Sequence, residues 1–88
     1  MIRVERKNGD EFLVVVEERG SRTEHTVTLD EEYYGELTDR KISKEELIKR
    51  SFEFLLAREP EESILSRFNL RVIGRYFPEF EETIKSIR

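Results

Sequence analysis

Cysteine is absent from this sequence, and histidine occurs only once, at position 25. Without cysteine, the chain has no disulfide framework, no thiolate nucleophile and no thiolate metal ligand. A single imidazole cannot form a histidine cluster around a metal ion. The four glycines make neither a phosphate-binding loop nor the nucleophile elbow of hydrolases. We therefore expect a protein that is not an enzyme, with no catalytic residue, no metal site and no cofactor.

Long hydrophobic runs and a surplus of basic residues are also missing. A charge stands already at Arg3, so we expect no secretory or membrane-spanning segment, a cytoplasmic location and no membrane partner. The 16 Lys and Arg residues are outnumbered by 20 Asp and Glu residues, which gives a net charge of −4. Proteins that bind nucleic acids usually carry excess positive charge, so this charge balance disfavours nucleic acid as a partner.

Charged and apolar residues are both abundant. Charged residues make up 41% of the 88 residues, and hydrophobic residues make up 36%. This composition is too apolar for a disordered acidic tail and too polar for a membrane protein. A chain of this length holds one hydrophobic core. We expect residues 1–88 to fold as a single domain.

Three segments near the N-terminus have the pattern of β-strands. Residues 2–6 alternate apolar and charged side chains, and the Asn-Gly pair at residues 8–9 suits a tight hairpin turn. Residues 12–16 are a continuous apolar run. A Gly-Ser pair at residues 20–21 then leads into a third candidate strand, residues 23–29. The pattern predicts an antiparallel meander of three strands.

The turn residues also predict how these strands pair. A two-residue turn at residues 8–9 places Val4 opposite Leu13. The second hairpin has two possible turns, a two-residue turn at residues 20–21 and a three-residue loop at residues 20–22. We favour the longer loop because it collects apolar residues of all three strands on one face. That face then carries Ile2, Val4, Leu13, Val15, Val27 and Leu29.

The rest of the chain has the signals of helices. Ser43 and Glu46 form a capping box ahead of residues 47–56, which repeat apolar side chains at helical spacing. Pro60 and Pro78 each suit the first turn of a further helix. The helix that begins after Pro60 would turn Ile64, Leu65 and Phe68 inward, with Asn69 as its breaker or as the next cap. The last of these helices carries apolar residues at Phe80, Ile84 and Ile87.

A shorter helix is expected between the strands and residue 43. Asp30 can cap it, and its apolar residues are Tyr33, Tyr34 and Leu37. The order of elements predicts an α+β domain, in which a three-stranded antiparallel meander sheet is followed by three to four helices that pack on it.

Aromatic and apolar residues exceed what one small core needs. The surplus lies on the second sheet face and around the helices, where Tyr76 and Phe77 also stand. Exposed patches of this kind mark protein contacts. We predict a protein-interaction domain, acting as a homodimer or with another protein, whose surface includes Phe12, Val14, Val16, Tyr33 and Tyr34. The alternative is that helices cover both sheet faces and that these residues belong to the core.

Two further features each have a functional and a structural interpretation. Arg67, Arg71 and Arg75 recur every four residues, so on a continuous helix they would form a stripe that contacts anions. Such a stripe is more often a solvated helix face. His25 lies close to glutamates in the favoured register, which would favour its charged form, but a lone histidine on a strand is more often structural.

Residues 26–58 contain a strand pattern followed by two helix patterns. The first part reads Thr-Val-Thr-Leu-Asp-Glu-Glu-Tyr-Tyr, and residues 43–50 read Ser-Lys-Glu-Glu-Leu-Ile-Lys-Arg. This arrangement resembles the ribbon-helix-helix regulators, in which two chains pair their strands and insert the ribbon into the DNA major groove. The resemblance implies DNA binding as the alternative function, with Thr26 and Thr28 facing outward and Ser43 capping the second helix. As a whole the chain also looks like small proteins of prokaryotes, a likeness that implies no particular activity.

Overall fold

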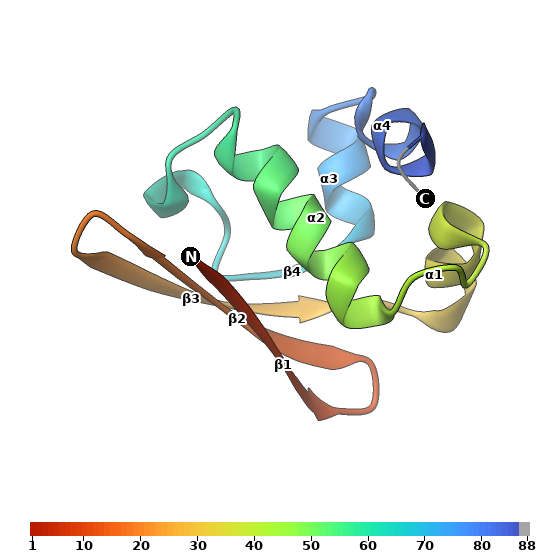
Figure 1. The fold of residues 1–88 in the computed structure, drawn as a ribbon, viewed down its shortest axis with the longest axis horizontal. Coiled ribbons are helices and arrows are strands. Elements are labelled where there is room, and N and C mark those ends of the chain that lie inside the picture. Colours follow the sequence, from red (N-terminus) through yellow and green to blue (C-terminus); the bar gives the residue numbers. More distant parts are fainter. Residues whose placement is uncertain (87–88) are drawn as a thin grey trace.

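A twisted β-sheet carries one long helix across one of its faces, and the remaining helices gather beside that helix (Figure 1). The computed structural model describes residues 1–86. The strands are β1 (Ile2–Asn8), β2 (Glu11–Glu18), β3 (Ser21–Thr28) and β4 (Arg67–Asn69). The helices are α1 (Glu31–Thr38), α2 (Lys44–Leu56), the short 3-10 helix η1 (Glu61–Ser63), α3 (Arg71–Tyr76) and α4 (Phe80–Ser86). Ile87, predicted as part of the last helix, lies outside the described residues.

The sheet has the order β1-β2-β3-β4, with the first three strands antiparallel and β4 parallel to β3. The α+β class predicted from the sequence is confirmed, and the structure adds a strand to the predicted meander. Residues 61–69 were expected to be helical, but they form η1 and β4. Backbone hydrogen bonds hold this segment against the edge of β3, from Thr26 N to Ser66 O (2.8 Å) and from Leu70 N to Thr28 O (2.9 Å). Within residues 1–86, no helix is long and apolar enough to cross a membrane.

The register of the first hairpin differs from the predicted one. Val4 lies opposite Val14 and not opposite Leu13. Asn8 pairs with Glu11, so the turn lies at residues 9–10, and a bulge between Arg6 and Asn8 adds one residue to β1. Together the two changes shift the pairing by one position. The prediction of a simple two-residue turn at residues 8–9 was therefore wrong.

The second hairpin turns one residue earlier than expected. Its loop consists of Arg19 and Gly20, and Glu18 pairs with Ser21. Both loop residues have positive φ angles, 50° for Arg19 and 85° for Gly20, as the tightest hairpin loops require. Arginine seldom adopts this conformation, so the sequence did not indicate it.

These registers turn β2 over relative to the prediction, while β1 and β3 keep the faces predicted for them. The face beneath α2 carries Ile2, Val4, Phe12, Val14, Val16, His25 and Val27, and Phe12, Val14 and Val16 are 0% exposed. Leu13 and Val15 point to the opposite face and are not part of the core cluster. Phe12, Val14 and Val16, predicted to form an association surface, therefore belong to the core, and Leu13 and Val15, predicted to face the core, lie on the outer face.

Helix α2 begins where the sequence predicts it. Ser43 is the N-cap, and its hydroxyl accepts a hydrogen bond from Glu46 N at 3.0 Å. The Glu46 carboxylate pairs with Arg50 one turn along the helix, at 2.9 Å. One side of the helix packs against the sheet through buried residues, which are Leu47, Ile48, Ser51, Phe52, Phe54 and Leu55.

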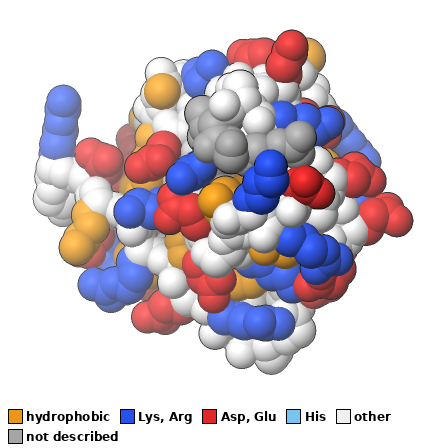
Figure 2. Space-filling model, turned by 45° about the vertical axis from the view of Figure 1, so that its right-hand side comes forward, with side chains coloured by type: hydrophobic (Ala, Val, Ile, Leu, Met, Phe, Trp, Pro, Cys, Tyr) orange, Lys and Arg blue, Asp and Glu red, His pale blue; other side chains and the backbone are white. Residues whose placement is uncertain are grey.

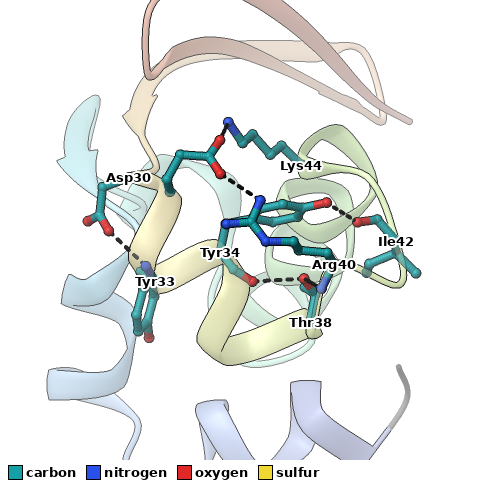
Figure 3. A network of polar contacts seen from close by, with 8 residues as sticks. Asp30, Tyr33, Tyr34, Thr38, Arg40, Ile42 and Lys44 are labelled. Atoms are coloured by element: carbon teal, nitrogen blue, oxygen red, sulfur yellow. Dashed lines mark hydrogen bonds and ion pairs between the residues drawn. The ribbon is translucent and has the colours of Figure 1, made fainter.

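Helix α1 is also confirmed, but its two tyrosines are not on the surface. The Tyr34 hydroxyl donates to the carbonyl oxygen of Ile42 at 2.6 Å (Figure 3), and the Tyr33 hydroxyl donates to Glu81 at 2.8 Å. Burial, with the nearby Glu81 carboxylate, raises the pKa of the Tyr33 phenol. Both rings are buried, which corrects the expectation that Tyr33 and Tyr34 are exposed on an interaction surface.

Candidate functional site

An apolar groove lies between the end of α2, the segment after η1, and α3. Its volume is about 240 Å³. Its walls are mostly apolar side chains, with Glu59 and Ser63 as polar members: Leu55, Ile64, Leu65, Phe68, Val72, Ile73, Tyr76 and Phe77. Leu65 and Tyr76 are 49% and 70% exposed, which makes them, with Met1, the most exposed large hydrophobic residues of the described chain. Apolar groups left on the surface beside a groove are typical of a binding site.

The wall formed by residues 63–65 is held in place by β3. His25 Nδ1 lies 2.7 Å from the carbonyl oxygen of Leu65, and His25 Nε2 lies 2.9 Å from Thr23 Oγ1. A carbonyl oxygen can only accept, so Nδ1 carries the proton and, in the neutral ring, Nε2 accepts from the Thr23 hydroxyl. The imidazole is 2% exposed, and its ring centre is 5.3 Å from that of Phe52. This geometry supports the structural interpretation of the histidine.

Helix η1 is held by the first residue of β3. The Ser21 hydroxyl donates a hydrogen bond to one carboxylate oxygen of the buried Glu61. The other oxygen of Glu61 has no hydrogen-bond partner within residues 1–86. Pro60 precedes η1 and prevents α2 from continuing into it. The groove wall is therefore attached to the sheet on both sides.

Helix α3 forms the opposite wall and is anchored to α1. Arg71 donates two hydrogen bonds to Asp30, at 3.0 and 3.1 Å, and its guanidinium carbon lies 4.6 Å from the centre of the Tyr33 ring. At the far end of α3, the Phe77 ring meets Phe54 of α2 edge-on, with centroids 5.8 Å apart. These contacts set the position of Val72, Ile73 and Tyr76 along the groove.

Asp30 has two roles, as the N-cap of α1 and as the partner of Arg71, and two substitutions distinguish them. The hydrogen bonds from Arg71 and from Tyr33 N hold the pKa of Asp30 below its ordinary value of 3.8. The resulting stabilisation is present above the unfolded pKa and is lost as the pH falls through the folded pKa. We expect Asp30→Ala to lower the free energy of unfolding by about 1–2 kcal/mol at pH 7. Because the carboxylate is partly exposed, Asp30→Asn, which keeps a capping oxygen, costs under about 1 kcal/mol.

Urea unfolding at pH 7 and pH 3 tests these values. The difference between wild type and Asp30→Asn shrinks at the lower pH, because pH 3 lies below the ordinary pKa of 3.8, so proton uptake by Asp30 in the unfolded wild-type chain favours unfolding. Equal stabilities of wild type and Asp30→Ala at pH 7 would contradict the anchoring role of Asp30.

The three arginines predicted as an anion stripe do not share one helix. Arg67 lies on β4 and pairs with Glu11 at 3.2 Å, while Arg71 pairs with Asp30. Arg75 is exposed near the end of α3. On the face drawn in Figure 2, basic and acidic side chains are intermingled. The stripe required a continuous helix, which β4 interrupts.

The two strand residues implied by the ribbon-helix-helix resemblance lie in the middle of the sheet. Thr26 and Thr28 point to the outer face of β3, and Ser43 caps α2. β3 pairs with β2 on one side and with β4 on the other. A ribbon between two chains through β3 would therefore have to displace β4, and DNA binding stays a prediction of the resemblance.

Polar groups at the groove rim define its charge. Glu59 is half-buried, and within residues 1–86 its carboxylate has no ion-pair or hydrogen-bond partner. The neighbouring Arg58 is engaged elsewhere, with its guanidinium carbon 3.6 Å from the Phe54 ring centre and its Nε 3.4 Å from Glu79. The groove thus combines apolar walls with one carboxylate at its edge. In the described part of the chain, no group of three metal-ligating side chains occurs.

Comparison of the chain with protein-family models, curated proteins and solved structures gives no match. Sequence reasoning found part of the groove, because Tyr76 and Phe77 belong to the aromatic surplus. It missed Leu65, which was expected to face inward on a helix.

Proposed function

We propose that this chain is a small non-catalytic protein-interaction domain, whose groove receives an apolar side chain of a partner protein next to a basic group. The observation that carries the proposal is the pair of exposed hydrophobic residues, Leu65 and Tyr76, on either side of an apolar groove. Tyrosine is enriched at protein interfaces because its ring buries apolar area while its hydroxyl stays hydrated.

The size of the groove favours a side chain over a free small molecule. Pockets for small molecules commonly hold about 300–1,000 Å³. The groove, at about 240 Å³, is below that range. It also opens between two exposed side chains, so a partner surface would cover Leu65 and Tyr76 while one of its own side chains enters between them.

The negative charge of Glu59 at the groove rim indicates which charge the partner carries. Covering Glu59 with an apolar surface would remove water from a carboxylate that has no partner in residues 1–86. An arginine or lysine of the bound protein would compensate for the lost water by forming an ion pair with Glu59. The favoured partner segment therefore carries an aliphatic or aromatic residue next to a basic residue.

Selection from a library of random displayed peptides tests this proposal. We expect enriched peptides to pair an apolar residue with Arg or Lys. Leu65→Asp should weaken the binding of an enriched peptide by about 10-fold or more, because it places a charge in the apolar contact. Ser66→Asp, which adds the same charge next to the groove, is the matched control and should bind as wild type does.

Charge reversal at the rim provides a second readout. Glu59→Lys should lose the basic peptides and enrich acidic ones instead. Peptides that bind Leu65→Asp as tightly as wild type would show that the groove is not the binding site, and the proposal would then be wrong.

A further inference from the structure

Strand β1 has one free edge along the sheet. Hydrogen bonds join Met1 and Glu17 in both directions, at 2.7 and 2.9 Å, so this pair is hydrogen-bonded. Because such pairs alternate along an antiparallel ladder, Arg3 and Glu5 also bond to β2. The backbone N–H and C=O groups of Ile2, Val4 and Arg6 then point away from β2, toward the free edge. This edge can accept a further strand.

We propose that two copies of this chain pair through β1, antiparallel and centred on Val4. In this arrangement Val4 pairs with Val4 of the second copy, and Ile2 pairs with Arg6 of the second copy. Each of these pairs exchanges both backbone hydrogen bonds. The inference is independent of the groove, which lies at the other end of the sheet order, beside β4.

Charge selects this register over its neighbours. Centring on Val4 places Arg3 of each copy opposite Glu5 of the other. Centring on Arg3 or on Glu5 also keeps the hydrogen-bonding phase, but it places like charges opposite each other at the centre. Directly opposed opposite charges stabilise a strand pair, and like charges destabilise it.

Arg3 and Glu5 are both available for this pairing. They are exposed on the outer face of the sheet, and within residues 1–86 neither has an ion-pair partner. The bulge after Arg6 ends the regular part of the strand, which limits pairing to residues 2–6. Charges on an edge strand commonly prevent association, but here their alternation permits one symmetric register.

The other face of β1 offers apolar surface to the second copy. Ile2 and Val4 are half-buried, as is Leu56 at the end of α2. A hollow between β1 and α2 is lined by Met1, Ile2 and Leu56 together with Lys49 and Glu53. A two-fold axis through Val4 would place the hollows of both copies on the same face of a continuous sheet. The flank of α2 beside the axis carries both signs of charge, so the two helices can approach.

A charge-swap experiment tests the pairing. Light scattering across a dilution series should give twice the 10.6 kDa chain mass for wild type. Arg3→Glu and Glu5→Arg should each raise the dimer dissociation constant by about 10-fold or more, because each variant creates two pairs of like charges that face each other across the dimer. The double variant Arg3→Glu/Glu5→Arg, and an equal mixture of the two single variants, should recover the dimer. Arg75→Glu makes the same charge change on α3 and should leave the mass unchanged.

Amide hydrogen exchange supplies a readout at the edge itself. The amides of Ile2, Val4 and Arg6 should be protected at high concentration and exchange fast on dilution, whereas those of Arg3 and Glu5 stay protected. A monomer at every concentration would overturn this inference and leave the groove proposal standing. A dimer that persists in both single variants would also overturn it, because the interface would then lie elsewhere.

Discussion

Phe12→Asp is expected to abolish the folded state. Phe12 is 0% exposed, on the sheet face beneath α2, opposite Val27 of β3. Losing a buried phenylalanine side chain costs about 3–5 kcal/mol, and burying a carboxylate adds several more. Small domains are stable by only about 5–15 kcal/mol in total. The variant should therefore lack a cooperative unfolding transition when circular dichroism is followed with temperature.

Leu13→Asp is the matched control, since it places the same charge one residue along the same strand. Leu13 points to the outer face, so we expect a cost of about 1 kcal/mol and a preserved transition. The register predicted from the turn residues demands the reverse, because it put Leu13 in the core and left Phe12 outside. A folded Phe12→Asp and an unfolded Leu13→Asp would show that the observed register is wrong.

Features that depend on neighbouring residues could be predicted from the sequence. Asp30 and Ser43 cap α1 and α2 as expected, because an N-cap needs only a side-chain oxygen and amides two or three residues away. The presence of three antiparallel strands also followed from local patterns. These features supply the α+β class and the approximate positions of the elements.

The registers could not be predicted, because they depend on two backbone irregularities. A bulge precedes the first turn, and Arg19 takes a positive φ angle of 50° in the second. Neither irregularity has a clear signal in residue type. Since side chains alternate between faces, the one-residue change in the first hairpin moved Phe12 from the predicted surface into the core.

The candidate site was hidden for a different reason. Residues 61–69 follow Pro60 and begin with two glutamates, which is a sequence typical of a helix start. The edge of β3 offers this segment backbone hydrogen-bond partners that a helix would not use. The hydrogen bonds from Thr26 N to Ser66 O and from Leu70 N to Thr28 O favour β4 over a helix. Leu65 is left exposed because its segment is a connection between η1 and β4. A contact across 40 residues of sequence, between His25 and Leu65, cannot be inferred from local patterns.

His25→Ala is expected to lower the free energy of unfolding by about 3 kcal/mol. The substitution leaves the Leu65 carbonyl oxygen and the Thr23 hydroxyl without their partners, and unmade buried hydrogen bonds cost about 1–3 kcal/mol each. It also removes the ring packed against Phe52. Urea unfolding measures the loss, and amide exchange should show that residues 64–66 open more readily, since the bond to β3 is gone.

Two further variants separate the contributions of the imidazole. His25→Phe keeps a ring against Phe52 but loses both hydrogen bonds, so its cost should fall between wild type and His25→Ala. Thr23→Val removes only the partner of Nε2 and should cost about 1 kcal/mol, without faster exchange at residues 64–66. A change below about 0.5 kcal/mol for His25→Ala would mean that the groove wall holds its position without the histidine. The carbonyl of Leu65 would then be satisfied in another way, and the anchoring of the groove wall by His25 would have to be abandoned.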